Sequence, residues 1–467
     1  MTKQSRMGSY RVHTTEVDDT ARGHQTVDLL TQLIRNACVN DGVSGSEATN
    51  VDALRDVLEH PGIDVEVYET APGRSNLVAR IQGSDASAPS LLLSGHTDVV
   101  PADPDGWRRD PFGGEVADGF VWGRGAIDML NLTASMAVAV RSLAEDGFTP
   151  DGTLVFAAVA DEEAGCDLGA RWLVENQPDA VRTDYVVTEF GGVRIGDDGL
   201  GISVGVAEKG PHWITIDVAG TPGHGSAPWA TDNALVNAAR VVDRIATYTS
   251  PAIITAAWRR AIDAYGLPAD LVAALKDPDA VDGAIELLTK DEPGFARQVH
   301  SCTHTTFAPT MLDAGVKTNV IPDHARLAVD IRVMPGVDQA DVTVMLRDAI
   351  GDLWDRVHVT FNDPRSASES PVESPLWDVL QAAGRRLVPG SHSVPAMMGG
   401  FTDSYWYRKL GAVAYGAGLF SDRMPMDQVG GMFHGRDERI DVDSLTLDTE
   451  LWRQVAQDLL APTAHRH

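Results

Sequence analysis

The stretch Ser90–Asp98, with the sequence SLLLSGHTD, joins an apolar run to a histidine and an aspartate. A short apolar run of this kind is typical of a strand that is buried on both faces of a parallel sheet. His96 and Asp98 would therefore lie at the carboxyl end of that strand. Open α/β sheets place their ligand and catalytic sites at this edge.

A histidine and an aspartate two residues apart are more often a structural pair than a metal site, so the signal lies in what recurs downstream. Further acidic residues and a second histidine each follow a strand-like run or a glycine turn, and they are Asp128, Asp161, Glu162, Glu163, Glu189 and His434. Two histidines and several carboxylates suit a pair of divalent ions such as zinc, with Asp128 as the bridge. The alternative is that these acidic residues lie at the edge of the sheet without binding a metal.

The composition is that of an ordinary globular protein, with 43% hydrophobic and 22% charged residues. A chain of 467 residues is long for a single hydrophobic core, so two domains are expected. The net charge of −29 argues against nucleic acid and anionic membrane surfaces as partners, because both select basic patches.

Cysteine usage indicates a reducing compartment. Cys38, Cys166 and Cys302 are odd in number and far apart, so no disulfide framework is expected. The polar N-terminus lacks the apolar segment of a signal peptide, and no run approaches the roughly 20 apolar residues of a membrane helix. We therefore expect a cytoplasmic protein that does not bind membranes.

Strand and helix patterns alternate from about residue 25 to residue 205, which predicts an α/β fold with a mostly parallel, helix-covered sheet. A long Pro- and Gly-rich loop at residues 101–125 is expected to be functional. From about residue 208 the order changes to that of a ferredoxin-like α+β unit. Its expected strands and helices span residues 213–218, 233–245, 317–321, 326–333, 340–350 and 357–361.

The α/β pattern resumes near residue 374, so the α+β unit is expected to be an insertion. We expect a catalytic domain formed by residues 1–207 and 364–467, with residues 208–363 inserted and residues 1–22 flexible. The helical, partly charged stretch at about 250–300 has no assigned role.

Glu162 and Glu163 are neighbours whose side chains point in opposite directions in an extended chain. Glu163 can therefore bind a metal while Glu162 faces a bridging water, whose pKa two metals lower to about 7. Glu162 would take the water's proton and pass it to the leaving nitrogen. Asp98 would hydrogen-bond the ring nitrogen of His96 that does not bind metal.

Two residues of the inserted unit could contact a substrate. His224, in the glycine-rich loop at residues 220–226, could donate to an oxyanion, or it could be a loop histidine without a role. Arg332 ends a strand and could bind a carboxylate with both arms of its guanidinium, or it could form a surface ion pair.

Four motifs resemble those of the co-catalytic dinuclear zinc exopeptidase and deacylase family, which includes glutamate carboxypeptidase, aminoacylase and succinyl-diaminopimelate desuccinylase. They are GHTDVVP at 95–101, GRG at 123–125 leading to Asp128, DEEAG at 161–165 and HGRDE at 434–438. The resemblance runs from about residue 27 to residue 460. It implies two divalent ions, zinc first and cobalt or manganese as alternatives.

The resemblance also implies roles for individual residues. One zinc takes His96 and Glu189, the other takes Glu163 and His434, and Asp128 bridges them. Glu162 is the general base. The inserted unit becomes a lid that also forms a homodimer, in which His224 stabilises the oxyanion while Asn319 and Arg332 hold the carboxylate end of the substrate.

Glu189, where the aminopeptidase and dipeptidase members have Asp, is similar to the deacylases and carboxypeptidases. The expected reaction is hydrolysis of an N-acyl amino acid or of a C-terminal peptide bond by a hydroxide that bridges the metals. A dipeptidase or aminopeptidase of the same family is the alternative. Several relatives have an arginine where this chain has Tyr405, so a more apolar pocket is expected there.

Two readings lie outside this family. Residues 201–205, GISVG, match the nucleophile elbow of serine hydrolases around Ser203, but that motif needs a helix directly after the strand, and here the strand pattern continues. A non-catalytic binding protein would be favoured if a ligand or the base were missing, and none is.

Overall fold

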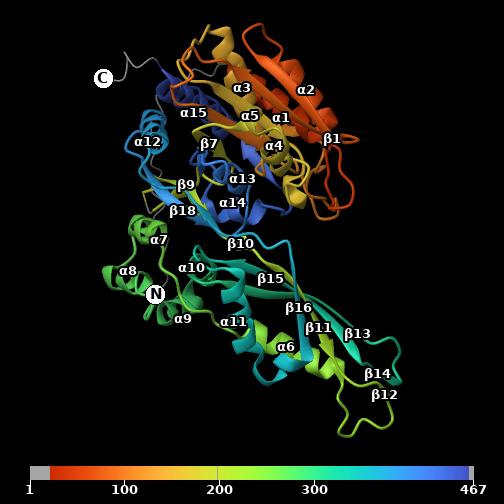
Figure 1. Ribbon diagram of the computed structural model, residues 1–467. Helices are drawn as coiled ribbons and strands as arrows, with labels where there is room; N and C mark the ends of the chain where they lie inside the picture. Colours follow the sequence, from red (N-terminus) through yellow and green to blue (C-terminus); the bar gives the residue numbers. More distant parts are fainter. Residues whose placement is uncertain (1–20, 197, 462–467) are drawn as a thin grey trace. The chain divides into compact units, whose positions relative to one another are not determined.

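The computed structural model describes residues 21–196 and 198–461 (Figure 1). The chain forms two compact units. Unit 1 contains residues 1–204, 371–394 and 406–467, and unit 2 contains residues 205–370 and 395–405. Most of the segment for which the sequence predicts flexibility, residues 1–22, lies outside the described residues, and its last two residues open helix α1 (Ala21–Arg35).

Unit 1 is built on a sheet whose centre is parallel. Its central strands lie in the order β6-β3-β7-β19, and β1 and β2 extend the β6 edge antiparallel. All six residues of β3 and of β6 are buried, as expected for strands covered on both faces. The α/β fold with a mostly parallel sheet is therefore confirmed. The strands are β1 (Asp64–Ala71), β2 (Arg74–Ile81), β3 (Leu91–His96), β6 (Leu154–Val159), β7 (Tyr185–Thr188) and β19 (Val413–Gly416).

Helices of unit 1 pack against one another and against the sheet. Helix α3 is buried along almost its whole length, because its small and apolar residues meet α1, α2, α15 and strand β3. Helix α12 packs on α15. The bounds are α2 (Ala48–Leu58), α3 (Leu130–Glu145), α4 (Ala170–Asn176), α5 (Pro178–Val181), α12 (Pro375–Leu387), α14 (Met426–Met432) and α15 (Val442–Leu460), and α13 (Ser404–Lys409) continues from unit 2 into unit 1.

The stretch expected to be a loop, residues 101–125, contains a short hairpin. Strands β4 (Glu115–Ala117) and β5 (Phe120–Trp122) pair with each other, and β5 also pairs with β20 (Arg439–Asp441). Strands of three residues are too short to produce a recognisable alternation in the sequence. The hairpin ties the segment before Asp128 to the segment after His434.

Unit 2 contains an antiparallel sheet in the order β10-β15-β11-β16, with β13 also paired to β15. Helix α6 packs against this sheet and α11 packs against α6 (Figure 1). The α+β character expected for this part of the chain is present. The bounds are β10 (Gly210–Pro211), β11 (Trp213–Ala219), α6 (Ala234–Ala246), β13 (Thr306–Ala314), β15 (His324–Val333), α11 (Gln339–Ile350) and β16 (Val357–Asn362).

One strand of unit 2 differs from the expectation. The strand predicted at residues 317–321 is only β14 (Val320–Ile321), which pairs with β12 (Gly223–His224) outside the main sheet. The main sheet instead contains β13, which was not predicted. Pro309 and a bulge between Pro309 and Met311 interrupt its alternation, and proline is tolerated in strands mainly at such edges and bulges.

The stretch at 250–300 is helical, as predicted. The aromatic rings of Tyr265 and Phe295 lie 5.4 Å apart there, and Trp258 and Val299 are buried. Within the part of the chain that the structure describes, no helix combines the length and apolarity needed to cross a membrane.

The helices of the stretch at 250–300 are α7 (Ala256–Ala261), α8 (Ala269–Leu275), α9 (Val281–Asp291) and α10 (Pro293–Thr303). The strands not yet given are β8 (Arg194–Ile195), β9 (Gly201–Glu208), β17 (Ser368–Glu369) and β18 (His392–Met398).

Candidate metal centre

The predicted metal ligands come together in unit 1, at the carboxyl edge of the parallel strands. His96 is the last residue of β3, Glu163 lies in a short 3₁₀ helix (Glu162–Ala164) after β6, and Glu189 directly follows β7. Because these strands are parallel neighbours, their carboxyl ends meet. Asp128 precedes α3, and His434 follows α14.

A glycine before His96 lets α3 approach the sheet. A Cβ atom at Gly95 would lie 2.3 Å from Oγ1 of Thr133 and 3.2 Å from its Cα atom, so a larger residue would push the helix away. The Thr133 hydroxyl donates a hydrogen bond to the carbonyl of His96 at 2.8 Å. The glycine of the GHTD motif therefore serves the close packing that positions His96.

Asp128 lies between the two histidines. One of its carboxylate oxygens is 3.2 Å from Nε2 of His96, and the other is 3.2 Å from Nε2 of His434. Glu163 approaches Nε2 of His434 at 3.1 Å, and Glu189 approaches Nε2 of His96 at 3.9 Å. Each histidine thus has its own glutamate and shares the aspartate, which is the donor set of two neighbouring cation sites.

Glu162 belongs to the same cluster. Ligand atoms of His96, Glu162 and Glu189 lie within 4.8 Å of one another, as do those of His96, Asp128 and Glu163. Four carboxylates therefore surround two imidazoles.

The pKa values reflect this excess of negative charge. Burial opposes protonation of His96, but Asp128, Glu189 and Glu162 raise its pKa well above the ordinary value. Hydrogen bonds to Asp128 and Glu163 raise the pKa of His434 to about 10. Burial, and then the charge of Asp128, raise the pKa of Glu189 well above its usual range. Cations placed among these groups would neutralise the excess charge.

An unsatisfied oxygen supports the same conclusion. Oε1 of Glu163 is buried and, among the residues that the structure describes, has no hydrogen-bond partner. A buried carboxylate oxygen without a partner is costly, and a cation would satisfy it. Two imidazoles and four carboxylates also match the ligand preferences of zinc and similar divalent ions, so the residues fit a dinuclear metal site.

Asp98 makes different contacts from those expected. Nδ1 of His96 donates to the main-chain carbonyl of Asp98 at 2.9 Å, while the Asp98 carboxylate is 3.6 Å away. Because this contact uses the proton on Nδ1, Nε2 is the nitrogen that would bind a metal ion. The carboxylate of Asp98 instead accepts hydrogen bonds from the N–H groups of Glu162 and Glu163, each at 3.2 Å.

Sequence reasoning missed Glu438, although it lies in a motif quoted above. Its buried carboxylate accepts hydrogen bonds from the N–H groups of Ile127 at 2.8 Å and Asp128 at 3.2 Å. Its other oxygen lies 2.6 Å from Nη1 of Arg124, and Arg124 also donates to the carbonyl of Gly435 at 3.0 Å. Burial raises the pKa of Glu438 to about 7. The pair connects the segments that carry Asp128 and His434.

In unit 2, His224 and Asn319 are neighbours. The N–H of Gly225 donates to the carbonyl of Asn319 at 2.9 Å, next to the β12–β14 pairing. Nδ1 of His224 accepts a hydrogen bond from the N–H of Ser226 at 3.2 Å. A neutral His224 therefore carries its proton on Nε2, where it can be donated.

Arg332 is engaged within its own strand. Its Nε and Nη2 donate to the two carboxylate oxygens of Asp330 at 2.8 and 3.1 Å, and its guanidinium lies 5.8 Å from the ring of Trp213. The ion pair considered from the sequence is thus present. A substrate carboxylate would have to share or displace Asp330.

Ser203 and Tyr405 are both buried. Ser203 lies inside β9, which continues to Glu208, so the strand–helix turn of a nucleophile elbow is not formed there. Its Oγ accepts a hydrogen bond from the N–H of Val193 at 3.0 Å. Tyr405 is 8% exposed, and its ring lies 5.2 Å from that of Phe401.

Known proteins resemble this chain over most of its length. A model of peptidase family M20/M25/M40 matches residues 92–458. An N-fatty-acyl-amino acid synthase/hydrolase of Xenopus tropicalis is 27% identical over 459 residues, covering 93% of this chain and 86% of the relative. Aminoacylase-1 of Sus scrofa is 26% identical and covers 94% of this chain and 97% of the relative. Among solved structures, an M20 family metallo-carboxypeptidase from Sulfolobus solfataricus has a TM-score of 0.69 at 16% identity, covering 93% of this chain and 98% of that one.

Proposed function

Because the chain belongs to peptidase family M20/M25/M40 and is a hydrolase of amide bonds, we propose that it releases an amino acid from an N-acyl amino acid or from a peptide C-terminus. The observation that carries the proposal is the position of Asp128 between His96 and His434. Glu189 in place of aspartate favours the deacylases and carboxypeptidases. Two relatives whose names refer to acylated amino acids support the same choice.

The site would hold two divalent ions, with zinc preferred and cobalt or manganese as alternatives. His96 and Glu189 would bind one ion, Glu163 and His434 the other, and Asp128 both. When bound, such ions polarise a carbonyl oxygen and lower the pKa of a bound water to about 7.

The protein's own groups would then move protons and stabilise charge. Glu162 takes a proton from the attacking water and returns it to the leaving nitrogen as the C–N bond breaks, which yields a carboxylic acid and a free amine. His224, from unit 2 of this chain or of a second copy, donates its Nε2 proton to the oxygen on which negative charge develops. Asn319 and Arg332 hold the substrate carboxylate.

Side-chain specificity would depend on the surroundings of Tyr405. The aromatic pair that it forms with Phe401 favours an apolar group over a carboxylate at this position. A dipeptidase or aminopeptidase remains the second candidate within the family, and Glu189 weighs against it.

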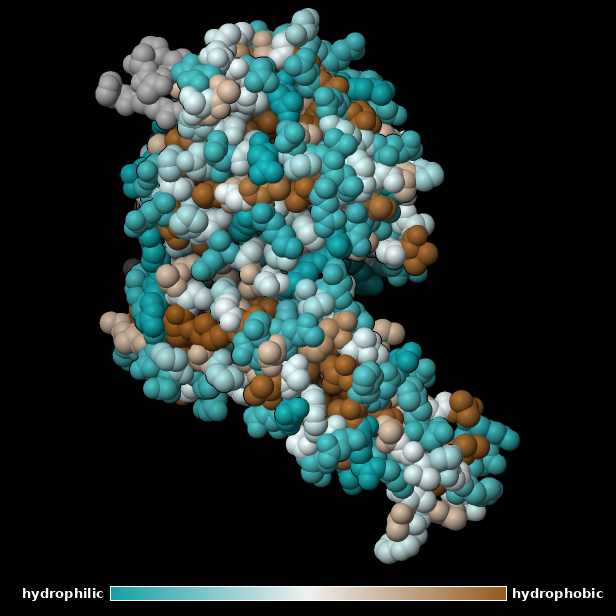
Figure 2. All heavy atoms as spheres, viewed as in Figure 1, coloured by the Kyte–Doolittle hydropathy of each residue, from teal (hydrophilic) through white to brown (hydrophobic). Residues whose placement is uncertain are grey.

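We also propose that unit 2 forms a homodimer. Strand β13 is an edge strand, and it exposes Met311 at 72% and Leu312 at 44%, while the neighbouring α6 exposes Val236 at 46%. Figure 2 shows hydrophobic side chains on the surface where β13 and β14 lie. Light scattering would test this, because Met311→Glu should convert a dimer to a monomer.

A cytoplasmic location is proposed as well. Cys38, Cys166 and Cys302 are all buried thiols, which suits a reducing compartment. Fractionation of cells that produce the protein would test the location.

The decisive experiment measures amino acid release by the zinc-reconstituted protein. The panel contains N-acyl amino acids with short and long acyl chains, peptides with blocked N-termini, and free dipeptides. Release from acylated compounds supports the proposal, and release from free dipeptides alone would establish the second candidate. A chelator should abolish the activity, whereas a serine-directed acylating agent should not.

Glu162→Gln provides the matched blank. It should lose nearly all turnover while it still binds two metal ions, because only the proton acceptor is removed. If metal content falls in parallel with activity, the assignment of Glu162 as the base is wrong.

A further inference from the structure

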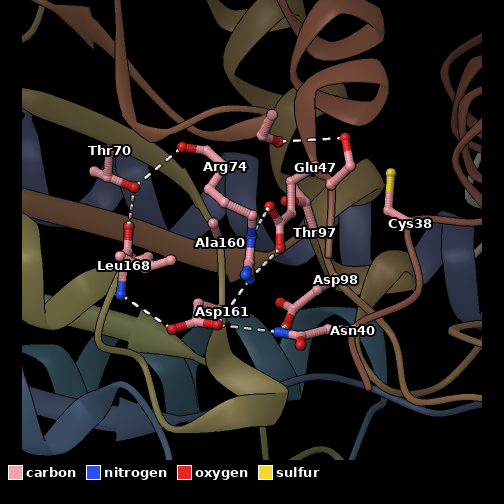
Figure 3. Close-up of polar contacts among 12 residues, drawn as sticks. Cys38, Asn40, Glu47, Thr70, Arg74, Thr97, Asp98, Ala160, Asp161 and Leu168 are labelled. Carbon is pink, nitrogen blue, oxygen red and sulfur yellow. Dashed lines mark hydrogen bonds and ion pairs between the residues drawn. The ribbon is translucent and has the colours of Figure 1, made fainter. Parts of the chain in front are cut away.

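A buried polar network contacts the segment that carries Glu162 and Glu163. Its centre is Arg74, at the start of β2, which is 9% exposed. Arg74 donates from Nε and Nη2 to the two carboxylate oxygens of Glu47, each at 2.7 Å. Nη2 also donates to Oδ1 of Asp161 at 2.7 Å (Figure 3). One planar guanidinium thus holds two carboxylates from different parts of unit 1.

Asp161 directly precedes the proposed general base, and its backbone is strained. Its φ of +67° lies in the left-handed region, which is unfavourable for a residue with a side chain. The carboxylate accepts hydrogen bonds from Arg74, from Nδ2 of Asn40 at 3.1 Å and from the N–H of Leu168 at 3.0 Å. These contacts stabilise Asp161 in this conformation.

Asn40 links this residue to Asp98. Its Nδ2 group has two hydrogens, and the second contact is to Oδ2 of Asp98 at 2.9 Å (Figure 3). Asp98 in turn accepts from the N–H groups of Glu162 and Glu163. The three consecutive residues 161–163 are therefore anchored to Asn40 and Arg74, directly or through Asp98.

We propose that Arg74 and Asn40 are positioning residues for the reaction. Adjacent residues Glu162 and Glu163 must serve different purposes, one as base and one as metal ligand, so a small rotation of the turn would misplace both side chains. The network prevents this rotation by fixing the backbone on either side of the Asp161–Glu162 peptide. The inference rests on the proposed function, since it takes its roles for Glu162 and Glu163 from there.

Asn40→Ala is the main test, and Asn36→Ala is its matched control. Asn36 also donates two hydrogen bonds from Nδ2, to the carbonyl of Thr49 at 3.2 Å and to Oδ1 of Asn50 at 2.9 Å. Asn40 also accepts a hydrogen bond from the N–H of Gly42 at 3.1 Å. The control therefore loses the same two donated bonds, in the same region, without touching the turn. We expect Asn40→Ala to lower kcat about 10- to 100-fold, with KM and zinc content unchanged, because a misplacement of about 1 Å can cost this much. Asn36→Ala should leave kcat unchanged.

Arg74→Ala supplies a second test through chemical rescue. Tens of millimolar guanidinium should restore part of the lost turnover, because the free cation can occupy the space between Glu47 and Asp161. Arg80→Ala is the control on the same strand, where Arg80 donates to the carbonyl of Ala180 at 3.1 Å. It should neither lose turnover nor respond to guanidinium. If Arg74→Ala does not fold, Asn40→Ala alone decides.

A spectroscopic measurement separates this inference from the proposed function. In the cobalt-substituted protein, the visible absorption of the ion reports how Glu163 is placed, and it needs no substrate. The Asn40→Ala spectrum should differ from that of the wild type, and the Asn36→Ala spectrum should not. Inactivity of the wild type on every amide would defeat the proposed function, and the cobalt spectra would still decide the positioning role.

Two results would overturn the inference. One is an Asn40→Ala protein with wild-type kcat and an unchanged cobalt spectrum. The other is an Asn40→Ala protein whose loss of turnover equals that of Asn36→Ala, or is fully explained by its loss of zinc. A network with a purely structural role would give either of these results.

Discussion

Arg124 and Glu438 form an ion pair in the interior of unit 1, with 2.6 Å between Nη1 and Oε2 and with side chains that are 4% and 0% exposed. Removing one partner of a buried pair leaves an uncompensated charge, which typically costs about 3 to 5 kcal/mol. We expect Arg124→Met to lower the free energy of unfolding of the metal-free protein by about this amount. Urea titration measures it.

The same substitution should weaken zinc binding, because the pair holds the segments of Asp128 and His434. The control is Arg55→Met, which breaks the surface ion pair with Asp52, where both side chains are more than half exposed. Surface pairs contribute about 0 to 1 kcal/mol. Equal losses in the two variants would show that the buried pair has no special role.

Metal stoichiometry should depend on which ligand is removed. Asp128 contacts both histidines, so Asp128→Ala should lose both zinc ions after dialysis. His434→Ala should retain the ion associated with His96 and Glu189. Atomic spectrometry counts the bound metal. Retention of one tightly bound ion in Asp128→Ala would contradict its bridging position.

His224 should affect turnover without affecting metal content. Loss of a single donor to an oxyanion typically lowers kcat about 10²- to 10³-fold, and we expect this of His224→Ala. Ser226→Ala is the control. It removes the Ser226 hydroxyl, which lies 2.7 Å from Nδ1 of His224, but it keeps the main-chain N–H that donates to Nδ1 and leaves the proton on Nε2. Steady-state kinetics with the best acylated substrate measures both variants, and normal turnover in His224→Ala would reject the oxyanion role.

Lys209 should make stability depend on pH. It is fully buried and donates to the carbonyl of His304 at 2.7 Å and to Oγ1 of Thr306 at 3.1 Å. Burial lowers its pKa to about 7 from 10.5. Between these values the unfolded chain binds a proton that the native protein does not, so the free energy of unfolding rises with pH by up to about 1.4 kcal/mol per unit.

Lys209→Met removes this titration. The wild type should therefore gain stability relative to Lys209→Met as the pH rises from 7 to 10, and the difference should stay flat below pH 7. Denaturant unfolding at several pH values measures the difference, with Lys317→Met as the control at an exposed position. A difference that does not vary with pH would mean that the native lysine stays protonated throughout this range.

Much of the sheet could be predicted because its central strands are buried on both faces. The sequences of such strands are apolar runs, and the residues that directly follow parallel strands lie together at the carboxyl edge of the sheet. This logic brings His96, Glu163 and Glu189 together from the sequence alone. Asp128 and His434 follow glycine turns, and their motifs indicated them.

The supporting contacts could not be predicted, because they depend on tertiary packing between distant segments. Nothing around Arg74 or Glu438 indicates which partner each would meet. The carboxylate of Asp98 was expected to contact His96, but a main-chain carbonyl occupies that position, and such choices depend on local backbone geometry. Strand β13 escaped prediction because a proline breaks its pattern.

The position of β19 in the sheet has a consequence for synthesis. β19 pairs with β7, yet about 220 residues separate them in the chain. At the usual translation rate of about 5 to 20 residues per second, β19 is synthesised on the order of 10 to 45 s after β7. During that time an apolar strand edge stays open on the nascent chain, where it can pair with other chains. Chaperones that shield such edges on the ribosome should therefore improve the yield of this protein.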